Sequence, residues 1–169
     1  MTMSAMLLPE FDQEMKSTRK LLERVPEGRF DFRPHPKSRP LGPLASHIAD
    51  IPRRAVDVVE KESLDVAPQG AAPPRPAPAA SRQEILDRFD ANVAAARAAL
   101  AGATDAQLVV PWSLVAGGHT LFTVPRIGAI RAIVLSHIIH HRAQLGVYLR
   151  INDVPVPAIY GPSADEGAF

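Results

Sequence analysis

The sequence of 169 residues contains no cysteine. Disulfide bonds and thiolate metal ligands are therefore excluded, and any soft-metal site must use His, Met or carboxylate groups. Aromatic residues are also scarce, at 5%, whereas 46% of the residues are hydrophobic. A chain of this length and composition is typical of one domain with a sizeable core, so we expect residues 1–169 to form a single domain.

An excess of charge of one sign and a long apolar run are lacking as well. Lys plus Arg number 19 and Asp plus Glu 18, which gives a formal net charge of +1. This balance provides little attraction to nucleic acid or to an anionic membrane, and we predict neither as a partner. No uninterrupted apolar stretch reaches the roughly 18 residues of a membrane-spanning helix. Residues 1–8 do not resemble a signal peptide, so we expect a cytoplasmic protein.

Apolar residues recur at helical spacing in four segments. The predicted helices cover residues 4–25, 41–62, 81–102 and 125–151. The third begins with a capping box, in which Ser81 precedes Glu84 by three residues. Pro52 interrupts the second, which leaves two alternatives: the helix kinks there, or a new helix starts with Asp50 as its N-cap.

Two of the connecting segments have distinct compositions. Residues 65–80 are rich in Pro and Ala, and we predict an extended connector that proteases cut first, at Arg75. Residues 105–125 alternate apolar residues around Gly117-Gly118, a pattern that predicts a short β-hairpin. The fold class we predict is all-α: a four-helix bundle with a long Pro-rich crossover between the second and third helices.

Two histidines stand four residues apart in the fourth segment, at His137 and His141. Helical residues at this spacing are neighbours, and both imidazoles can reach one ion at about 2.0–2.1 Å. The pattern places them with Gln144 on the inner stripe of the helix, at three consecutive core positions. Buried polar groups cost free energy unless they are satisfied, and a metal ion would satisfy both imidazoles at once.

His47 is the candidate for a third ligand, because it lies one turn from Leu44 and one turn from Ile51 on a predicted apolar face. Taken alone, His47 fits a core histidine with an ordinary hydrogen bond better than it fits a metal ligand. Together, His47, His137 and His141 favour a metal site with open coordination positions, which is typical of catalytic sites. Three neutral nitrogens accept Zn, Ni, Fe, Co or Cu.

The other polar candidates have weaker signals. His140 is rotated by about 100° from His141, so we expect it at a flank, as a group supporting a ligand or as an acid–base. His119 either lines the mouth of the site or is solvated, and His35 is expected at the surface. Gln144 is predicted to bond a ligand imidazole or orient a neighbouring helix. Arg142 is predicted to form a structural ion pair, and residues 160–166 to pack against the bundle.

A longer pattern carries a family resemblance. The string His137-xxx-His141-Arg142-x-Gln144, followed by Tyr148-Leu149-Arg150 and Tyr160-Gly161-Pro162-Ser163, resembles the DinB/YfiT-like superfamily, as does Leu44-xx-His47-Ile48 upstream. The resemblance spans nearly the whole chain. It implies a four-helix bundle, often dimeric, with a divalent metal held by His47, His137 and His141. Relatives in this superfamily include transferases and isomerases that use low-molecular-weight thiols such as bacillithiol, mycothiol or glutathione.

We therefore expect a metal-dependent enzyme, a thiol transferase or hydrolase acting on small molecules with Zn, Ni or Fe as cofactor. The alternatives are a non-catalytic metal-binding stress-response protein and a helical interaction module. We also expect a homodimer, from the resemblance and from apolar residues on the fourth helix beyond its inner stripe, namely Leu135, Ile138, Leu145 and Leu149.

Overall fold

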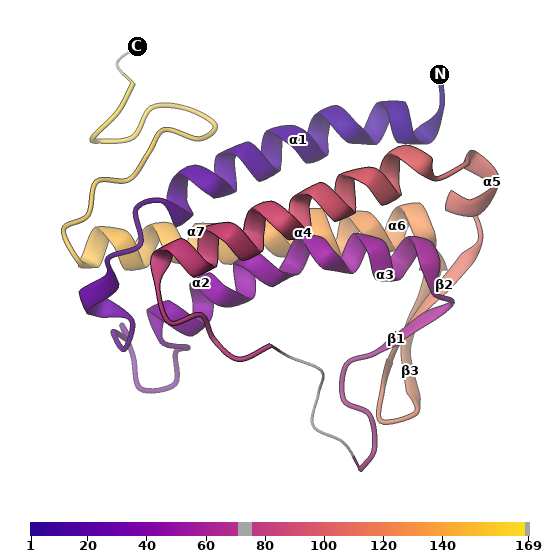
Figure 1. The fold of residues 1–169 in the computed structure, drawn as a ribbon, viewed down its shortest axis with the longest axis horizontal. Helices are drawn as coiled ribbons and strands as arrows, with labels where there is room; N and C mark the ends of the chain where they lie inside the picture. The colour runs from indigo at the N-terminus through magenta and orange to yellow at the C-terminus, as the bar shows by residue number, and fades with distance from the viewer. Residues whose placement is uncertain (71–75, 168–169) are drawn as a thin grey trace.

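Helices that lie side by side form most of the molecule (Figure 1). The computed structural model describes residues 1–70 and 76–167, so the predicted cleavage site Arg75 lies outside the described residues. Two long helices, α1 (Met3–Leu22) and α4 (Arg82–Gly102), pack against each other. Helix α2 (Leu41–Asp50) packs on α4 and on α7 (His137–Ile151), and α7 also contacts α1.

Side-chain caps and apolar faces account for the two long helices. The Thr2 side chain accepts a hydrogen bond from the Ala5 amide at the start of α1. At the start of α4, the Ser81 hydroxyl accepts from the Glu84 amide at 3.1 Å, as the capping box predicts. Both helices bury one face in the shared core, where Phe11 of α1 and Phe89 of α4 are almost inaccessible to solvent.

The interruption at Pro52 is a kink rather than a new capped helix. The chain passes from α2 through a 3-10 turn, η2 (Ile51–Arg53), into α3 (Arg54–Glu60), and the backbone keeps right-handed helical angles throughout. Asp50 makes no capping hydrogen bond; its carboxylate lies 3.7 Å from the Arg88 guanidinium of α4.

A three-stranded sheet shows that the predicted all-α class, and with it the plain four-helix bundle, is wrong. Strands β2 (Pro111–Ala116) and β3 (His119–Pro125) form the predicted antiparallel hairpin, with positive φ angles at Gly117 and Gly118. Strand β1 (Ser63–Asp65) then pairs parallel with β2. The Asp65 carboxylate accepts hydrogen bonds from the Gly117 and Gly118 amides, at 3.1 and 3.3 Å, which ties β1 to the hairpin turn.

The fourth predicted helix is continuous but irregular. Short helices η1 (Glu27–Arg29) and α5 (Asp105–Leu108) precede it in the chain, and α6 (Arg126–Ile130) begins it. A π-helical segment, η3 (Arg131–Ser136), then leads into α7. The four apolar residues that suggested a dimer surface are buried within the chain, so they supply no free apolar face: Leu135, Ile138, Leu145 and Leu149.

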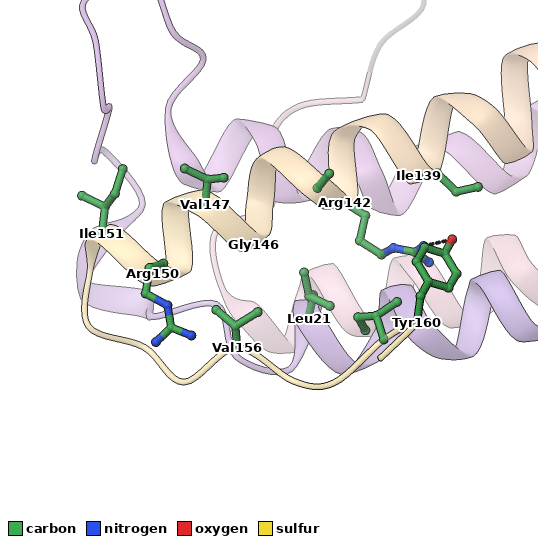
Figure 2. Close-up of a pocket in the computed structure, with 11 residues that line it drawn as sticks. Leu21, Ile139, Arg142, Gly146, Val147, Arg150, Ile151, Val156 and Tyr160 are labelled. Atoms are coloured by element: carbon green, nitrogen blue, oxygen red, sulfur yellow. Dashed lines mark hydrogen bonds between the residues drawn. The ribbon is translucent and has the colours of Figure 1, made fainter. Parts of the chain in front are cut away.

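The tail after α7 packs against a buried ion pair between α7 and α1. Arg142 forms this pair, as predicted, and the segment around Tyr160 packs on the helices, also as predicted. The Arg142 guanidinium lies 2.7 Å from the Glu14 carboxylate of α1, and the Tyr160 hydroxyl donates to the same carboxylate at 2.7 Å. Figure 2 shows the contact between Arg142 and Tyr160, beside a largely aliphatic cavity of about 430 Å³ between α7 and the tail. Within the described residues, none of the helices combines the length and the apolarity needed to cross a membrane.

Candidate metal centre

The three histidines singled out by the sequence meet between two helices. His47 comes from α2, and His137 and His141 come from the first two turns of α7. One candidate ligand atom from each lies within 4.8 Å of those of the other two. The Nε2 atom of His137 lies 3.3 Å from that of His47 and 2.9 Å from that of His141. The centre is half-buried, because all three side chains keep partial contact with solvent.

The π-helical segment sets the orientation of His137. The backbone amide of His137 donates to the Val134 carbonyl instead of the Ile133 carbonyl four residues back. The imidazole Nδ1 of His137 lies 3.3 Å from that Ile133 oxygen. A carbonyl oxygen only accepts, so the hydrogen bond places the imidazole proton on Nδ1 and leaves a lone pair on Nε2. That lone pair faces the other two histidines. π-Helical insertions occur frequently at functional sites.

Gln144 has the same effect on His141. Its Oε1 atom accepts from Nδ1 of His141 at 2.7 Å, and its amide nitrogen lies 3.1 Å from Nε2 of His140. The first predicted alternative for Gln144, a bond to an imidazole of the site, is therefore confirmed. Its predicted core position is wrong: Gln144 is exposed, whereas Tyr148, one turn further along α7, is buried as the predicted stripe requires.

Burial keeps the imidazoles neutral. It lowers the pKa of His47 to about 3, with a further contribution from the nearby Arg39 guanidinium. It lowers the pKa of His137 to about 4, and there Arg54 is the largest neighbouring charge. The pKa of His141 is also lowered by burial, in part against the effect of its bond to Gln144. Near neutral pH all three rings are in the uncharged form that binds metals.

These observations fit a divalent ion. Two nitrogens at about 2.05 Å from one ion are about 2.9–3.4 Å apart when the angle between them is about 90–110°. The observed Nε2 separations of 2.9 and 3.3 Å fall in this interval. The Nε2 lone pairs of His137 and His141 face each other at 2.9 Å, which is unfavourable unless an additional proton or a cation lies between them. The burial of the rings disfavours the proton.

The remaining histidines lie outside this group. His35 and His119 are exposed, His35 in the loop before α2 and His119 at the start of β3. His140 is exposed on the flank of α7, where its ring centroid lies 4.8 Å from that of His141. It reaches the site through Gln144, in agreement with the predicted flank position.

A cleft of about 860 Å³ opens beside His47, and no pattern in the sequence predicted it. Charged side chains from α2, η2, α3 and the preceding loop line it, among them Arg39, Asp50 and Arg54. Burial raises the pKa of Asp50, against the opposing effect of the arginines around it. No periodic pattern marks these residues, because the kink at Pro52 and the loop before α2 bring them together.

The fold is mainly helical with a three-stranded sheet, and nitrogens of three histidines converge between two of its helices to form a candidate metal centre. The sequence model of the DinB superfamily matches residues 10–145, so the chain belongs to that superfamily, as the residue pattern indicated. No curated protein matches the sequence significantly.

Two crystal structures resemble the fold. A DinB-like protein from Bacillus cereus is 24% identical, with a TM-score of 0.66, and the match covers 90% of this chain and 95% of that protein. A DinB-like protein from Bacillus subtilis is 17% identical, with a TM-score of 0.68 and coverage of 91% and 96%. At these identities the similarity shows the fold alone.

Proposed function

We propose that the chain binds one divalent metal ion through Nε2 of His47, His137 and His141. The observation that carries the proposal is the convergence of these atoms while two of the three Nδ1 atoms are held by oxygen acceptors. Hydrogen bonds of this type fix the tautomer of a ligating imidazole and raise its basicity. The family agrees with a metal role, since the resemblance implies the same three ligands.

The proposed activity is that of a transferase or hydrolase acting on small molecules, with a thiol or water as nucleophile. A divalent ion on three protein nitrogens keeps open positions and lowers the pKa of a thiol or water bound there. The cleft of about 860 Å³ beside His47 offers room for a small molecule next to one of the three proposed ligands. On the chain's side, Ile133 and Gln144 hold two of the rings in position, and Arg39 and Arg54 help to lower the pKa of His47.

Metal content tests the ligand assignment directly. Single substitutions His47→Ala, His137→Ala and His141→Ala should each reduce the bound metal sharply, because each removes one of three nitrogens. His35→Ala and His119→Ala are matched controls and should retain one ion per chain. Elemental analysis and titration calorimetry provide the measurement. Full metal retention after substitution of His137 and His141 would show that the ligand assignment is wrong.

Catalysis needs a separate test. The metal-loaded protein should accelerate conjugation of a low-molecular-weight thiol to an electrophile, or hydrolysis of a small ester or amide, and His137→Ala should abolish the rate enhancement. A protein that holds its metal through the three histidines but accelerates none of these reactions would instead be a non-catalytic metal-binding protein.

A further inference from the structure

The aliphatic cavity of about 430 Å³ lies on the face of α7 that is turned away from the histidine centre. Each helical residue turns by about 100°, so Ala143, two residues after His141, points to the opposite face of α7. Ala143 lines the cavity, which runs between α7 and the tail as a groove (Figure 2). Small-molecule sites typically have volumes of about 300–1,000 Å³, and this groove falls within that range. It is separate from the proposed metal centre, so an inference about it does not depend on that centre.

Apolar side chains from three segments form most of the described lining of the groove. Leu21 comes from α1, Val147 and Ile151 come from α7, and Val156 comes from the tail. Val147 is 57% exposed and Ile151 is 50% exposed. A ligand in the groove would remove this apolar surface from water, which is favourable.

Polar contacts attach the tail at both ends of the groove. At one end, Nη1 of Arg150 donates to the Asp165 carboxylate at 3.2 Å. At the other, the Arg142 guanidinium lies 2.7 Å from the Glu14 carboxylate, to which the Tyr160 hydroxyl also donates. The tail is therefore a fixed wall, and the groove is formed before any ligand binds.

The same contacts balance the charges of the groove. Arg142 and Arg150 both belong to its described lining, and each is paired with a carboxylate. An anionic group bound at either arginine would also meet the carboxylate of Glu14 or Asp165, and like charges repel. The charge of the lining therefore matches a ligand that carries no charge of its own.

From this arrangement we infer that the groove binds a neutral, mainly aliphatic small molecule of roughly ten non-hydrogen atoms. If each atom occupies about as much space as a water molecule in the liquid, about 30 Å³, such a ligand takes up about 300 Å³. The groove of about 430 Å³ has room for it. This site is additional to the proposed function, which concerns the histidines on the other face of α7.

Two molecules with the same chain provide the test, 1-octanol and octanoate, because they differ mainly in the charge of the head group. Titration calorimetry of the whole chain near neutral pH should show one octanol bound per chain. Octanoate should bind about tenfold more weakly, because its carboxylate meets a like charge at either end of the groove. 1-Hexanol should bind about fourfold more weakly than octanol, since it lacks two methylene groups that the open groove buries in part.

Variants assign the binding to the groove. Ala143→Leu fills part of the cavity and should weaken octanol binding about tenfold, whereas Ala95→Leu, at an exposed position of α4, is the matched control and should leave it unchanged. Val147→Ser removes apolar surface without filling the groove and should weaken octanol about threefold. Asp165→Asn removes the charge that balances Arg150, so octanoate should then bind about as tightly as octanol.

Each outcome supports or overturns the inference. Absence of saturable octanol binding to the parent chain would overturn it, and equal octanol affinity in Ala143→Leu and Ala95→Leu would place the ligand outside the groove. Octanoate that binds the parent as tightly as octanol would overturn the neutral class of ligand. A parent dimer that binds no octanol and that Ala143→Leu converts to a monomer in light scattering would show that a second copy of the chain covers the groove instead. Circular dichroism confirms that each variant is folded, and octanol affinity that is the same with and without zinc keeps this test independent of the metal centre.

Discussion

Acid should destabilise the metal-free protein through its histidine centre before most carboxylates titrate. The structure keeps His47 and His137 uncharged, with pKa values of about 3 and about 4, against the ordinary histidine pKa of 6.5. In the unfolded chain both rings become protonated as the pH falls below this ordinary value. The perturbation is therefore a simple titration from about pH 7 to about pH 4, with a chelator present.

The sign and the size follow from linkage between protonation and folding. Below pH 6.5 the unfolded chain binds protons that the folded chain does not, so stability is fully present above this pH and is lost as the pH falls. Each histidine contributes at most about 1.4 kcal/mol per pH unit, or about 7 kcal/mol for the two over about 2.5 units. Both side chains are partly exposed and screened by water, so we expect less than half of this, about 3 kcal/mol.

Urea unfolding at a series of pH values measures this loss. The parent protein should lose about 3 kcal/mol of unfolding free energy, whereas His47→Gln and His137→Gln should show a shallower dependence, since glutamine does not titrate. His35→Gln serves as the control, because His35 is exposed, and it should follow the parent. Carboxylates that titrate near pH 4 affect all variants alike. A pH dependence in the two centre variants equal to that of the parent would refute the buried, neutral centre.

Three further outcomes are expected. Gln144→Ala should weaken metal binding about 10–100-fold in calorimetry, because His141 loses the acceptor of its Nδ1 proton, whereas His140→Ala should retain the metal. Arg142→Met should lower the free energy of unfolding by about 3–5 kcal/mol in urea, because it leaves the Glu14 carboxylate buried without its partner, and a loss below about 1 kcal/mol would contradict this reasoning. The resemblance to the superfamily alone now predicts a homodimer, because the apolar residues of the fourth predicted helix are buried within the chain. Light scattering that shows a monomer at micromolar concentration would contradict this prediction.

The helices could be predicted from the sequence because their signals are local. Apolar spacing and the Ser81 cap located α4, and the Gly117-Gly118 pair located the hairpin, since each depends on residues within a few positions. Strand β1 was missed for the opposite reason. It has three residues, too few to show an alternating pattern, and its partner β2 lies about 50 positions further along the chain. A parallel pair of this kind is stabilised only after the helices between the strands have packed.

Helical spacing predicted which histidines lie close together, but it did not predict the hydrogen bonds and charges that set the protonation of their rings. A period of 3.6 residues places His137 and His141 on one face whether or not a π-helical segment precedes them. That segment directs the His137 amide to Val134, so the Ile133 oxygen can meet the imidazole instead. Arg39 and Arg54, which lower the pKa of His47, come from a loop and from the residue after a kink, where no periodicity applies. Spacing therefore predicts which side chains meet, whereas their proton positions and the charge around them depend on the irregular backbone on either side.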